Sequence, residues 1–478
     1  MAASFFSNYL KRWHPERDIE NWNKRAGDWQ SSFVHRVIKK IPQIVPAISV
    51  GNDRDDYWLS NGARIYIDFN SKLEMATAEC LAGSLTGLAN EKALELILHQ
   101  AAQSAASSEH LKSVSFYKDN VGFNVNEYGF PVEVTYGSHQ NYSYKTENRE
   151  EIFELMRNFI PVAIPISGNG HILKKKNGKF AYAFSQRAQH IFRLKGIPTT
   201  GNRAIINLRD EPLMDKSSEQ SRLHIISRDG TRCELQTWLL DTITHLILRL
   251  GEEGWKLPAR FRLSGPVKTL RQLNTQIELD YKVATRSGFK DVISYNYIFL
   301  NAAKQLQSLS VSEKNALEEW ERVLELLRAK AFDKLVGELD WVTKWYLIKN
   351  KLKNSNWKLD DVQIWKASRE YHNISISPKI SWYRLLEERG YIRHLISRAD
   401  IRQALTIPPP TRAESRGNFV KKCFKDRNFL RKISLFNWDQ AEDFNDTAYF
   451  FGKPDDPFST CTVIGKKKYL NPRRSIGF

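Results

Sequence analysis

The segment NGARIYIDF constrains the fold more than any other part of the chain. Side chains alternate between the two faces of a β-strand, so Ile65 and Ile67 would face a core while Arg64, Tyr66 and Asp68 share the opposite face. Its β-branched and aromatic residues, bounded by turn-forming ones, are typical of strands. The pattern predicts a sheet with one packed face and one polar face that could carry chemistry.

Acidic residues continue beyond this strand. In KLEMATAEC, Glu74 and Glu79 lie on either side of Thr77. With Asp68 and Tyr66 they make three acids and one phenol, and magnesium prefers such hard oxygen donors. A half-exposed strand with a surface ion pair has the same pattern, because alternating polar residues are common on such strands. The pattern alone favours this second interpretation.

Two further clusters of polar residues follow. The segments FYKDN and YGSHQNYSY combine Lys118, Asp119, His139 and Asn141. The segments SQRA, NRAIINLRDEP and RLH supply arginines that could bind phosphate, namely Arg187, Arg203, Arg209 and Arg222. Taken singly, each arginine is more often a surface ion-pair residue. Neither a GxxxxGK[ST] loop nor a GxGxxG motif is present, so a P-loop or Rossmann nucleotide site is not supported.

The length of 478 residues favours one large catalytic body with one smaller domain. The N-terminus has no apolar run typical of a signal peptide, and no segment approaches the roughly 20 apolar residues of a membrane helix. We therefore expect a cytoplasmic protein. The four cysteines have no CxxC spacing, which predicts neither a zinc knuckle nor a disulfide framework.

A net charge of +18 favours a polyanionic partner, which could be nucleic acid, an anionic membrane surface or an acidic protein. Lysine runs such as KKK at Lys174 are usually solvated faces, and no known nucleic-acid motif accompanies them. Nucleic acid is therefore not the expected partner, although salt-sensitive retention on DNA would revive it.

Strands and helices alternate in the first two thirds of the chain. Strands are predicted at Ile65, Ser113 and Arg203, and a helix from Lys92. A second helix carries a leucine and isoleucine stripe and should stop at Gly251. A capping box of Ser310 with Glu313 should start a long helix through LEEWERVLELLRAKAFDKL, and helices should dominate to about residue 405. These elements predict an α+β fold.

Taken in order, these segments resemble the Pup ligase and depupylase family. NGARIYIDF with ATAEC is similar to the family's NGARLYLD…PEYATAEC, YGSHQNY to YGxHENY, and FSQRAQHI to LSQRAEHI. NRAIINLRDEP…RLHII, DWVTKWYL, PPPTRAESRG and FNWDQ extend the likeness over about residues 34–440. The ordered recurrence of several motifs is far more specific than any one of them.

The resemblance implies a glutamine-synthetase-like fold, in which helices back a curved antiparallel β-sheet cradle and a small C-terminal domain is attached. The Pro-rich stretch at 406–417 marks off a small basic C-terminal domain (411–478). The likeness, which begins near residue 34, divides the rest into a divergent N-terminal segment (1–33) and a catalytic domain (34–410). The implied cofactors are ATP and Mg²⁺. The implied partners are an acidic, disordered Pup-like modifier, lysine-bearing proteins and a proteasome pathway, without a membrane.

The resemblance also implies roles for single residues. Asp68 would be the catalytic base, and Tyr66 and Glu74 would bind magnesium. ATP would be contacted by five residues: Arg64, Thr77, Trp438, Arg209 and Arg222. The implied reaction is ATP-dependent phosphorylation of the modifier's C-terminal Glu side chain, followed by attack of a lysine to form an isopeptide bond.

Some positions depart from the family pattern. The family's first strand, GIETEFG, with its magnesium-binding Glu, has no match in residues 1–33. Gln140 and Gln189 stand where the family has Glu, and Leu213 where it has His. Three interpretations therefore remain open: a ligase, a deamidase or depupylase of the same fold, and a diverged non-catalytic protein that binds the modifier. The short spacing of about 27 residues between Val34 and Asn61 favours the ligase branch.

Overall fold

The computed structural model describes residues 33–50, 55–68, 72–110, 114–125, 131–175, 177–198, 201–208, 220–452, 460 and 462–466. Their contacts divide them into two units. The terminal unit holds the described residues between 33 and 114 and between 396 and 466. The central unit holds those between 115 and 395. The predicted boundary at 410/411 stays a prediction.

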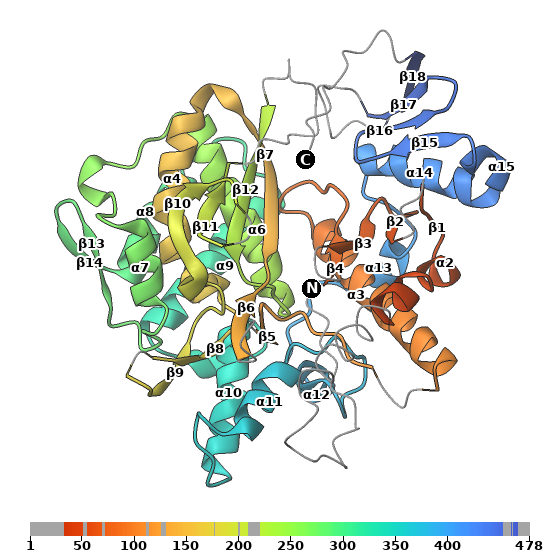
Figure 1. Ribbon diagram of the computed structural model, residues 1–478. Helices are drawn as coiled ribbons and strands as arrows, with labels where there is room; N and C mark the ends of the chain where they lie inside the picture. The colour runs from red at the N-terminus through yellow and green to blue at the C-terminus, as the bar shows by residue number, and fades with distance from the viewer. Residues whose placement is uncertain are drawn as a thin grey trace. The chain divides into compact units, whose positions relative to one another are not determined.

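The terminal unit contains two four-stranded antiparallel sheets. The first has the order β1-β2-β3-β4 and the second β15-β16-β17-β18 (Figure 1). The strands are β1 (Ala47–Ile48), β2 (Asp56–Leu59), β3 (Arg64–Asp68), β4 (Lys72–Ala76), β15 (Ile433–Phe436), β16 (Gln440–Asp443), β17 (Thr447–Phe451) and β18 (Thr462–Lys466). The helices are α2 (Ile41–Ile44), α3 (Leu85–Ser108), α13 (Arg398–Ala404), α14 (Arg412–Lys425) and α15 (Arg427–Leu430).

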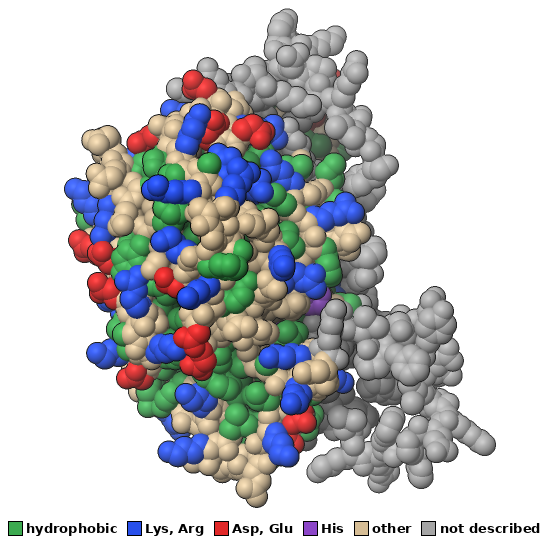
Figure 2. Space-filling model, turned by 90° about the vertical axis from the view of Figure 1, so that its left-hand side faces the viewer, with side chains coloured by type: hydrophobic (Ala, Val, Ile, Leu, Met, Phe, Trp, Pro, Cys, Tyr) green, Lys and Arg blue, Asp and Glu red, His purple; other side chains and the backbone are tan. Residues whose placement is uncertain are grey.

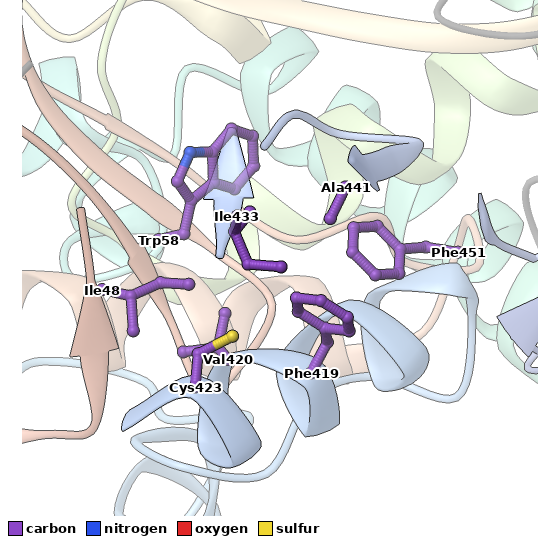
Figure 3. Close-up of a cluster of buried hydrophobic side chains, with 8 residues drawn as sticks. All are labelled: Ile48, Trp58, Phe419, Val420, Cys423, Ile433, Ala441 and Phe451. Carbon is purple, nitrogen blue, oxygen red and sulfur yellow. The ribbon is translucent and has the colours of Figure 1, made fainter. Parts of the chain in front are cut away.

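Helix α14 joins the two sheets through one shared core (Figure 3). Phe419, Val420 and Cys423 of α14 pack with Ile48 and Trp58 of the first sheet. The same cluster includes three residues of the second sheet, Ile433, Ala441 and Phe451. The C-terminal segment therefore shares a hydrophobic core with the sheet that carries Asp68.

The central unit is built around a sheet of order β10-β11-β12-β7, in which β10 and β11 are parallel and the other pairs antiparallel. Its strands are β10 (Ile191–Gly196), β11 (Arg203–Asn207), β12 (Gln220–Arg228) and β7 (Ser138–Lys145). Helices α4 (Arg149–Val162) and α6 (Glu234–Glu252) pack on each other and contact β11 and β7 respectively. The predicted stripe of α6 is buried throughout, which confirms its role in the core.

Short hairpins and helices complete the central unit. The hairpins are β5 (Val121–Val125) with β6 (Pro131–Thr135), β8 (His171–Lys174) with β9 (Phe180–Ala183), and β13 (Lys282–Thr285) with β14 (Gly288–Asp291). The helices are α5 (Ile164–Ser167), α7 (Pro266–Leu273), α8 (Val292–Ala303), α9 (Val311–Arg328), α10 (Asp340–Lys353), α11 (Val362–Glu370) and α12 (Trp382–Glu388). None of the described helices combines the length and apolar character needed to cross a bilayer.

The structure corrects three predicted elements. No strand forms in the described part of SVSFYKD: Tyr117 makes only an isolated bridge to Asn373, because the facing segment is too short for a ladder. Helix α6 ends at Glu252, and Gly254 with φ of +78° supplies the left-handed turn instead of Gly251. The capping box that starts α9 is confirmed. The helix ends at Arg328, earlier than predicted, and Lys330 just beyond it has a left-handed backbone conformation with φ of 53°.

Candidate functional site

Strand β3 lies between β2 and β4 in the first sheet of the terminal unit. Ile65 is fully buried, whereas Asp68 is exposed, as the alternation predicts. Tyr66 lies opposite Glu74 on β4, and Asp68 lies opposite Lys72 at the end of the pairing. The polar face of β3 therefore brings Arg64, Tyr66 and Asp68 together next to Glu74.

Arg64 is held rigidly on this face. Its Nε and Nη2 donate to the two carboxylate oxygens of Asp56 on β2, both at 2.7 Å. Its guanidinium carbon also lies 4.2 Å from the centroid of the Tyr66 ring and 5.0 Å from that of Trp58. Such bidentate pairing and stacking fix an arginine in one orientation.

Tyr66 and Glu74, the two predicted magnesium ligands, are hydrogen-bonded to each other across β3 and β4. Burial raises the pKa of Tyr66, and the negative charge of Glu74 and a hydrogen bond to it raise that pKa further. The Tyr66 phenol is therefore neutral at physiological pH and donates to the Glu74 carboxylate. The charge of Asp68 acts on Tyr66 in the same direction, as expected for a carboxylate on the same face.

The remaining predicted residues of this unit are Asp68, Thr77 and Trp438. Asp68 and Thr77 are both exposed, at the end of β3 and directly after β4. Trp438 lies between β15 and β16, and its ring centroid is 4.9 Å from that of Trp58 in an edge-on contact. Because Trp58 is the cross-strand neighbour of Arg64, Trp438 borders the polar face of β3.

Glu79 does not belong to the oxygen cluster that the sequence suggested. Its carboxylate accepts hydrogen bonds from Arg412 Nε at 2.6 Å and from both terminal nitrogens of Arg416. Burial alone would raise the pKa of Glu79. Arg416 and Arg412 instead lower that pKa to about 2, through their positive charges and their hydrogen bonds to the carboxylate. Glu79 is therefore a structural ion-pair residue, bound to the start of α14.

Arg416 connects this ion pair to the predicted site, although sequence analysis did not single it out. It is fully buried, and it donates from Nε and Nη2 to the Gly62 carbonyl at 3.0 and 2.6 Å. Its Nη1 donates to the Trp438 carbonyl at 2.6 Å. One guanidinium thus ties the turn before β3, the segment after β4 and the backbone of Trp438 together.

The predicted arginines of the central unit have different surroundings. Arg187 is buried and donates to the Ile226 carbonyl at 2.7 Å, and Arg203 donates to the Thr135 carbonyl at 3.2 Å. Burial lowers the pKa of Arg187 to about 9. Arg222 lies on β12 opposite Ser143 of β7. Arg209 and Leu213 lie outside the described residues.

The second polar cluster is spread over β7 and the loop before β5. His139 on β7 makes an edge-on ring contact with His224 of β12 at 5.0 Å, and the Asn141 backbone pairs with that of His224. Lys118 and Asp119 lie in the loop, where burial raises the pKa of Asp119. The loop and the segment that leads into β7 are nevertheless adjacent, because the Tyr136 N–H donates to the Asn120 carbonyl and Asn120 Nδ2 donates to the Tyr136 carbonyl, both at 2.9 Å.

Both glutamines that replace a family Glu act as hydrogen-bond donors. Gln140 Nε2 donates to Asp241 Oδ1 at 2.8 Å, and Gln189 Nε2 donates to the Arg271 carbonyl at 2.9 Å. An ionised Glu cannot donate, and at position 140 it would face another carboxylate. The local structure therefore accounts for both replacements.

No group of three or more His, Cys, Asp or Glu side chains suited to a metal ion occurs within the described ranges. Tyr66 and Glu74 supply two oxygen donors on adjacent strands, which suits part of a magnesium site. Residues 1–32, where the unmatched N-terminal Glu strand would fall, lie outside the described ranges.

The family described as "Pup-ligase protein" matches residues 2–442 of the chain. A Pup–protein ligase of Paenarthrobacter aurescens (strain TC1) is 32% identical over 416 residues, covering 84% of this chain and 87% of the relative. A Pup–protein ligase of Acidimicrobium ferrooxidans is 32% identical over 374 residues, covering 76% of this chain and 79% of that protein.

Two solved structures share the fold. One is the complex between the prokaryotic ubiquitin-like protein Pup and its ligase PafA, with a TM-score of 0.74, 24% identity and coverage of 90% of this chain and 85% of that one. The other is PafA in complex with ADP, with a TM-score of 0.72, 24% identity and coverage of 96% and 95%. These likenesses confirm the predicted α+β, glutamine-synthetase-like fold class.

Proposed function

Because the chain belongs to the Pup ligase family, we propose that it is an ATP-dependent ligase that attaches a small Pup-like modifier to lysines of other proteins. The observation that carries the proposal is the polar face of β3. This strand presents Arg64, Tyr66 and Asp68 next to Glu74 of β4, and Trp438 borders the same face.

The proposed reaction has two steps. The side-chain carboxylate of the modifier's C-terminal Glu takes the γ-phosphoryl group of ATP, and ADP leaves. A lysine amine then attacks the acyl carbon, the bond to the phosphate oxygen breaks with its electron pair, and inorganic phosphate leaves. An isopeptide bond results. Phosphorylation is needed because a free carboxylate has no leaving group that an amine can displace.

Asp68 is the proposed general base of the second step. Lysine is protonated at neutral pH and must lose a proton to become a nucleophile. A carboxylate can accept that proton when it lies within hydrogen-bond reach of the amine. Asp68 suits this role because it is exposed at the end of β3, where a lysine of another protein can approach.

Tyr66 and Glu74 are the proposed protein ligands of Mg²⁺. A bound magnesium ion offsets negative charge on the phosphates during phosphoryl transfer. The same proposal assigns Arg64, Thr77 and Trp438 to contacts with ATP, together with Arg209 and Arg222. Asp56 keeps the Arg64 side chain ordered before a nucleotide arrives, which reduces the entropy lost on binding.

The excess of basic residues suits an acidic modifier, because complementary charge speeds association. Pup is the partner in the solved complex with PafA, and we propose a Pup-like protein as the partner here. Proteins that carry the modifier on their lysines would then pass to a proteasome pathway.

Incubation with Pup, ATP, Mg²⁺ and a lysine-bearing target protein tests the proposal. We expect ADP release and a conjugate from the unaltered protein, and no conjugate from Asp68→Asn, because Asp68 acts on the lysine that attacks in the second step. Asp446→Asn is the matched control, because Asp446 is an exposed aspartate of the same unit in a turn that asparagine tolerates. Absence of both ADP and conjugate from the unaltered protein would refute the ligase.

The same reagents separate the two alternatives. Cleavage of a purified conjugate without ligation would identify a deamidase or depupylase of this fold. Binding of Pup in calorimetry without ATP binding or ADP release would identify a non-catalytic binding protein. The short spacing between Val34 and Asn61 favours ligation over the first outcome, and the presence of Arg64 and Asp68 on β3 argues against the second.

A further inference from the structure

Positive charge by itself does not mark a site on this molecule. Lysine and arginine side chains are spread over the face shown in Figure 2. Many basic side chains of the central unit already have acidic partners: Arg249 lies 2.8 Å from Glu313, and Lys304 lies 2.6 Å from Glu321. A surface that recognises a polyanion must therefore differ from these ion-paired residues, both in whether its basic side chains have acidic partners and in which other side chains lie beside them.

One stretch of the central unit does differ. Residues 345–366, which run from α10 into α11, carry lysines at 349, 351, 353, 358 and 366 with only two aspartates and no arginine. All five lysines are exposed, and none forms an ion pair with an acidic side chain of the described residues. We call this stretch, together with the β8–β9 hairpin, the lysine–tryptophan surface.

Aromatic rings lie between these lysines. Lys351 Nζ is 5.9 Å from the centroid of the Trp357 ring and 5.1 Å from that of Trp382. Lys349 Nζ is 6.0 Å from the Trp345 ring. Trp357 is 37% exposed, so part of its ring surface is open to a ligand.

The same rings join the hairpin to the helices. Trp345 stacks on Tyr182 of β9 with ring centroids 4.5 Å apart, and Trp365 of α11 meets Phe180 edge-on at 6.3 Å. The hairpin adds exposed lysines at 174, 175 and 179. Helix α11 also contacts β8, and Figure 1 shows these elements side by side. The hairpin, α10 and α11 therefore contribute lysines and aromatic rings from elements that contact one another.

We propose that the lysine–tryptophan surface binds single-stranded nucleic acid without sequence preference. Lysine is a mobile point charge that suits a phosphate backbone, whereas recognition of acidic peptides favours the bidentate fork of arginine, which residues 345–366 lack. An exposed indole between lysines is a stacking platform that accepts any base. The sequence could not predict this arrangement, because the hairpin and residues 345–366 are far apart in the chain and come together only through contacts such as Trp345 with Tyr182 and Trp365 with Phe180.

The first measurement is the fluorescence anisotropy of a fluorescein-labelled 20-nucleotide oligo(dT) with the full chain. For single strands, each phosphate that the protein neutralises adds about −0.7 to the slope of log affinity against log salt concentration. If five lysines neutralise phosphates, raising the salt from 50 to 200 mM should weaken binding about 100-fold. No binding at 50 mM salt would overturn the proposal.

Charge reversal then locates the site. Lys351→Glu/Lys353→Glu/Lys358→Glu should weaken binding at least 30-fold and make the salt slope shallower by about 2. The matched control is Lys268→Glu/Lys314→Glu/Lys334→Glu, which makes the same change in net charge at three exposed lysines elsewhere in the central unit. Equal loss in both triple variants would overturn the proposal, because net charge and not this surface would then explain binding.

Trp357→Ala tests the stacking. It should weaken oligo(dT) binding about tenfold while leaving the salt slope unchanged, because no charge is removed. Trp255→Ala, a change of a partly exposed tryptophan far from these lysines in sequence, should have no effect on binding. Vesicles with 30% phosphatidylserine are the competing anionic surface. Vesicle binding without oligonucleotide binding, or an unaltered affinity in Trp357→Ala, would overturn the proposal.

Discussion

Glu79 illustrates how single residues acquire their roles from distant parts of the chain. The sequence grouped it with Asp68 and Glu74 as an oxygen donor, but its partners Arg412 and Arg416 follow 333 and 337 residues later. Local patterns carry no information about such pairing. By contrast, strand geometry alone places Arg64, Tyr66 and Asp68 on one face of β3 and Ile65 on the other, so this arrangement could be predicted.

The Glu79 ion pair should make the protein sensitive to acid. The pKa of Glu79 is about 2 in the folded chain, below the ordinary value of 4.5. The ion pair therefore stabilises the folded protein fully above about pH 5, and this stabilisation is lost as the pH falls toward 2. We expect Glu79→Gln to lower the free energy of unfolding by about 2–3 kcal/mol at pH 7. Urea unfolding of both proteins at pH 7, 5 and 3 measures the difference, which should shrink to less than half at pH 3. A difference that does not change with pH would contradict the assignment.

Gln140 offers a second test, in which the expected loss of stability also becomes smaller as the pH falls. Burial raises the pKa of Asp241 to about 6, and Gln140 donates a hydrogen bond to it. Gln140→Glu removes the donor and adds a like charge, so we expect a loss of about 1–3 kcal/mol at pH 8 and a smaller loss at pH 5, where the two carboxyl groups can share a proton. Urea unfolding at both pH values is the measurement. Gln272→Glu adds the same charge at an exposed position and should change stability by less than about 0.5 kcal/mol. Equal losses at pH 5 and pH 8 would show that the charge pair is not responsible.

At the scale of elements, helices were more predictable than strands. The apolar stripe of α6 and the capping box of α9 are local signals, and both are confirmed. The expected strand at Ser113 failed because a ladder needs a partner, and the segment at 372–374 supplies only a short one. The sequence also gives no local indication that α14 packs closely against the turn before β3, apart from two glycines.

Gly62 and Gly417 are the glycines at this approach. Gly62 has φ of +80°, and a Cβ there would lie 2.7 Å from Ala413 Cβ, while a Cβ on Gly417 would lie 2.3 Å from the Ser60 carbonyl oxygen. Gly62→Ala should therefore cost both backbone strain and a clash that pushes α14 away from the β2–β3 turn, together about 2–4 kcal/mol.

Gly254→Ala separates the two costs. Gly254 has φ of +78°, but a Cβ there would meet nothing within 4 Å, so only the strain of about 1 kcal/mol applies. Urea unfolding of the two variants measures the difference. ATP affinity should also fall in Gly62→Ala and not in Gly254→Ala, because α14 holds Trp438 through Arg416. If the two variants lose equal stability and ATP affinity, the contact between Gly62 and α14 contributes nothing to either.

At the scale of the whole molecule, the motifs predicted the fold class, and comparison with solved structures confirms it. The division of the chain into parts was harder to predict, because the Pro-rich stretch at 406–417 is a composition signal that says nothing of packing. In the structure α14 begins within that stretch and shares a core with the first sheet. The predicted boundary therefore falls just before a helix that shares a core with the sheet that carries Asp68.

A chain ending at residue 410 tests this dependence. It lacks α14, so Ile48 and Trp58 would lose the apolar side chains that cover them, at a cost of about 1.5–3 kcal/mol for each side chain exposed. We expect its terminal unit to unfold at lower urea concentration than in the full chain, with exposed tryptophan shown by a red-shifted emission. Adding residues 411–478 as a separate peptide should restore part of the lost stability. If the shortened chain instead unfolds at the same midpoint as the full chain, residues 411–478 form an independent domain, and the cluster around α14 contributes nothing to the sheet that carries Asp68.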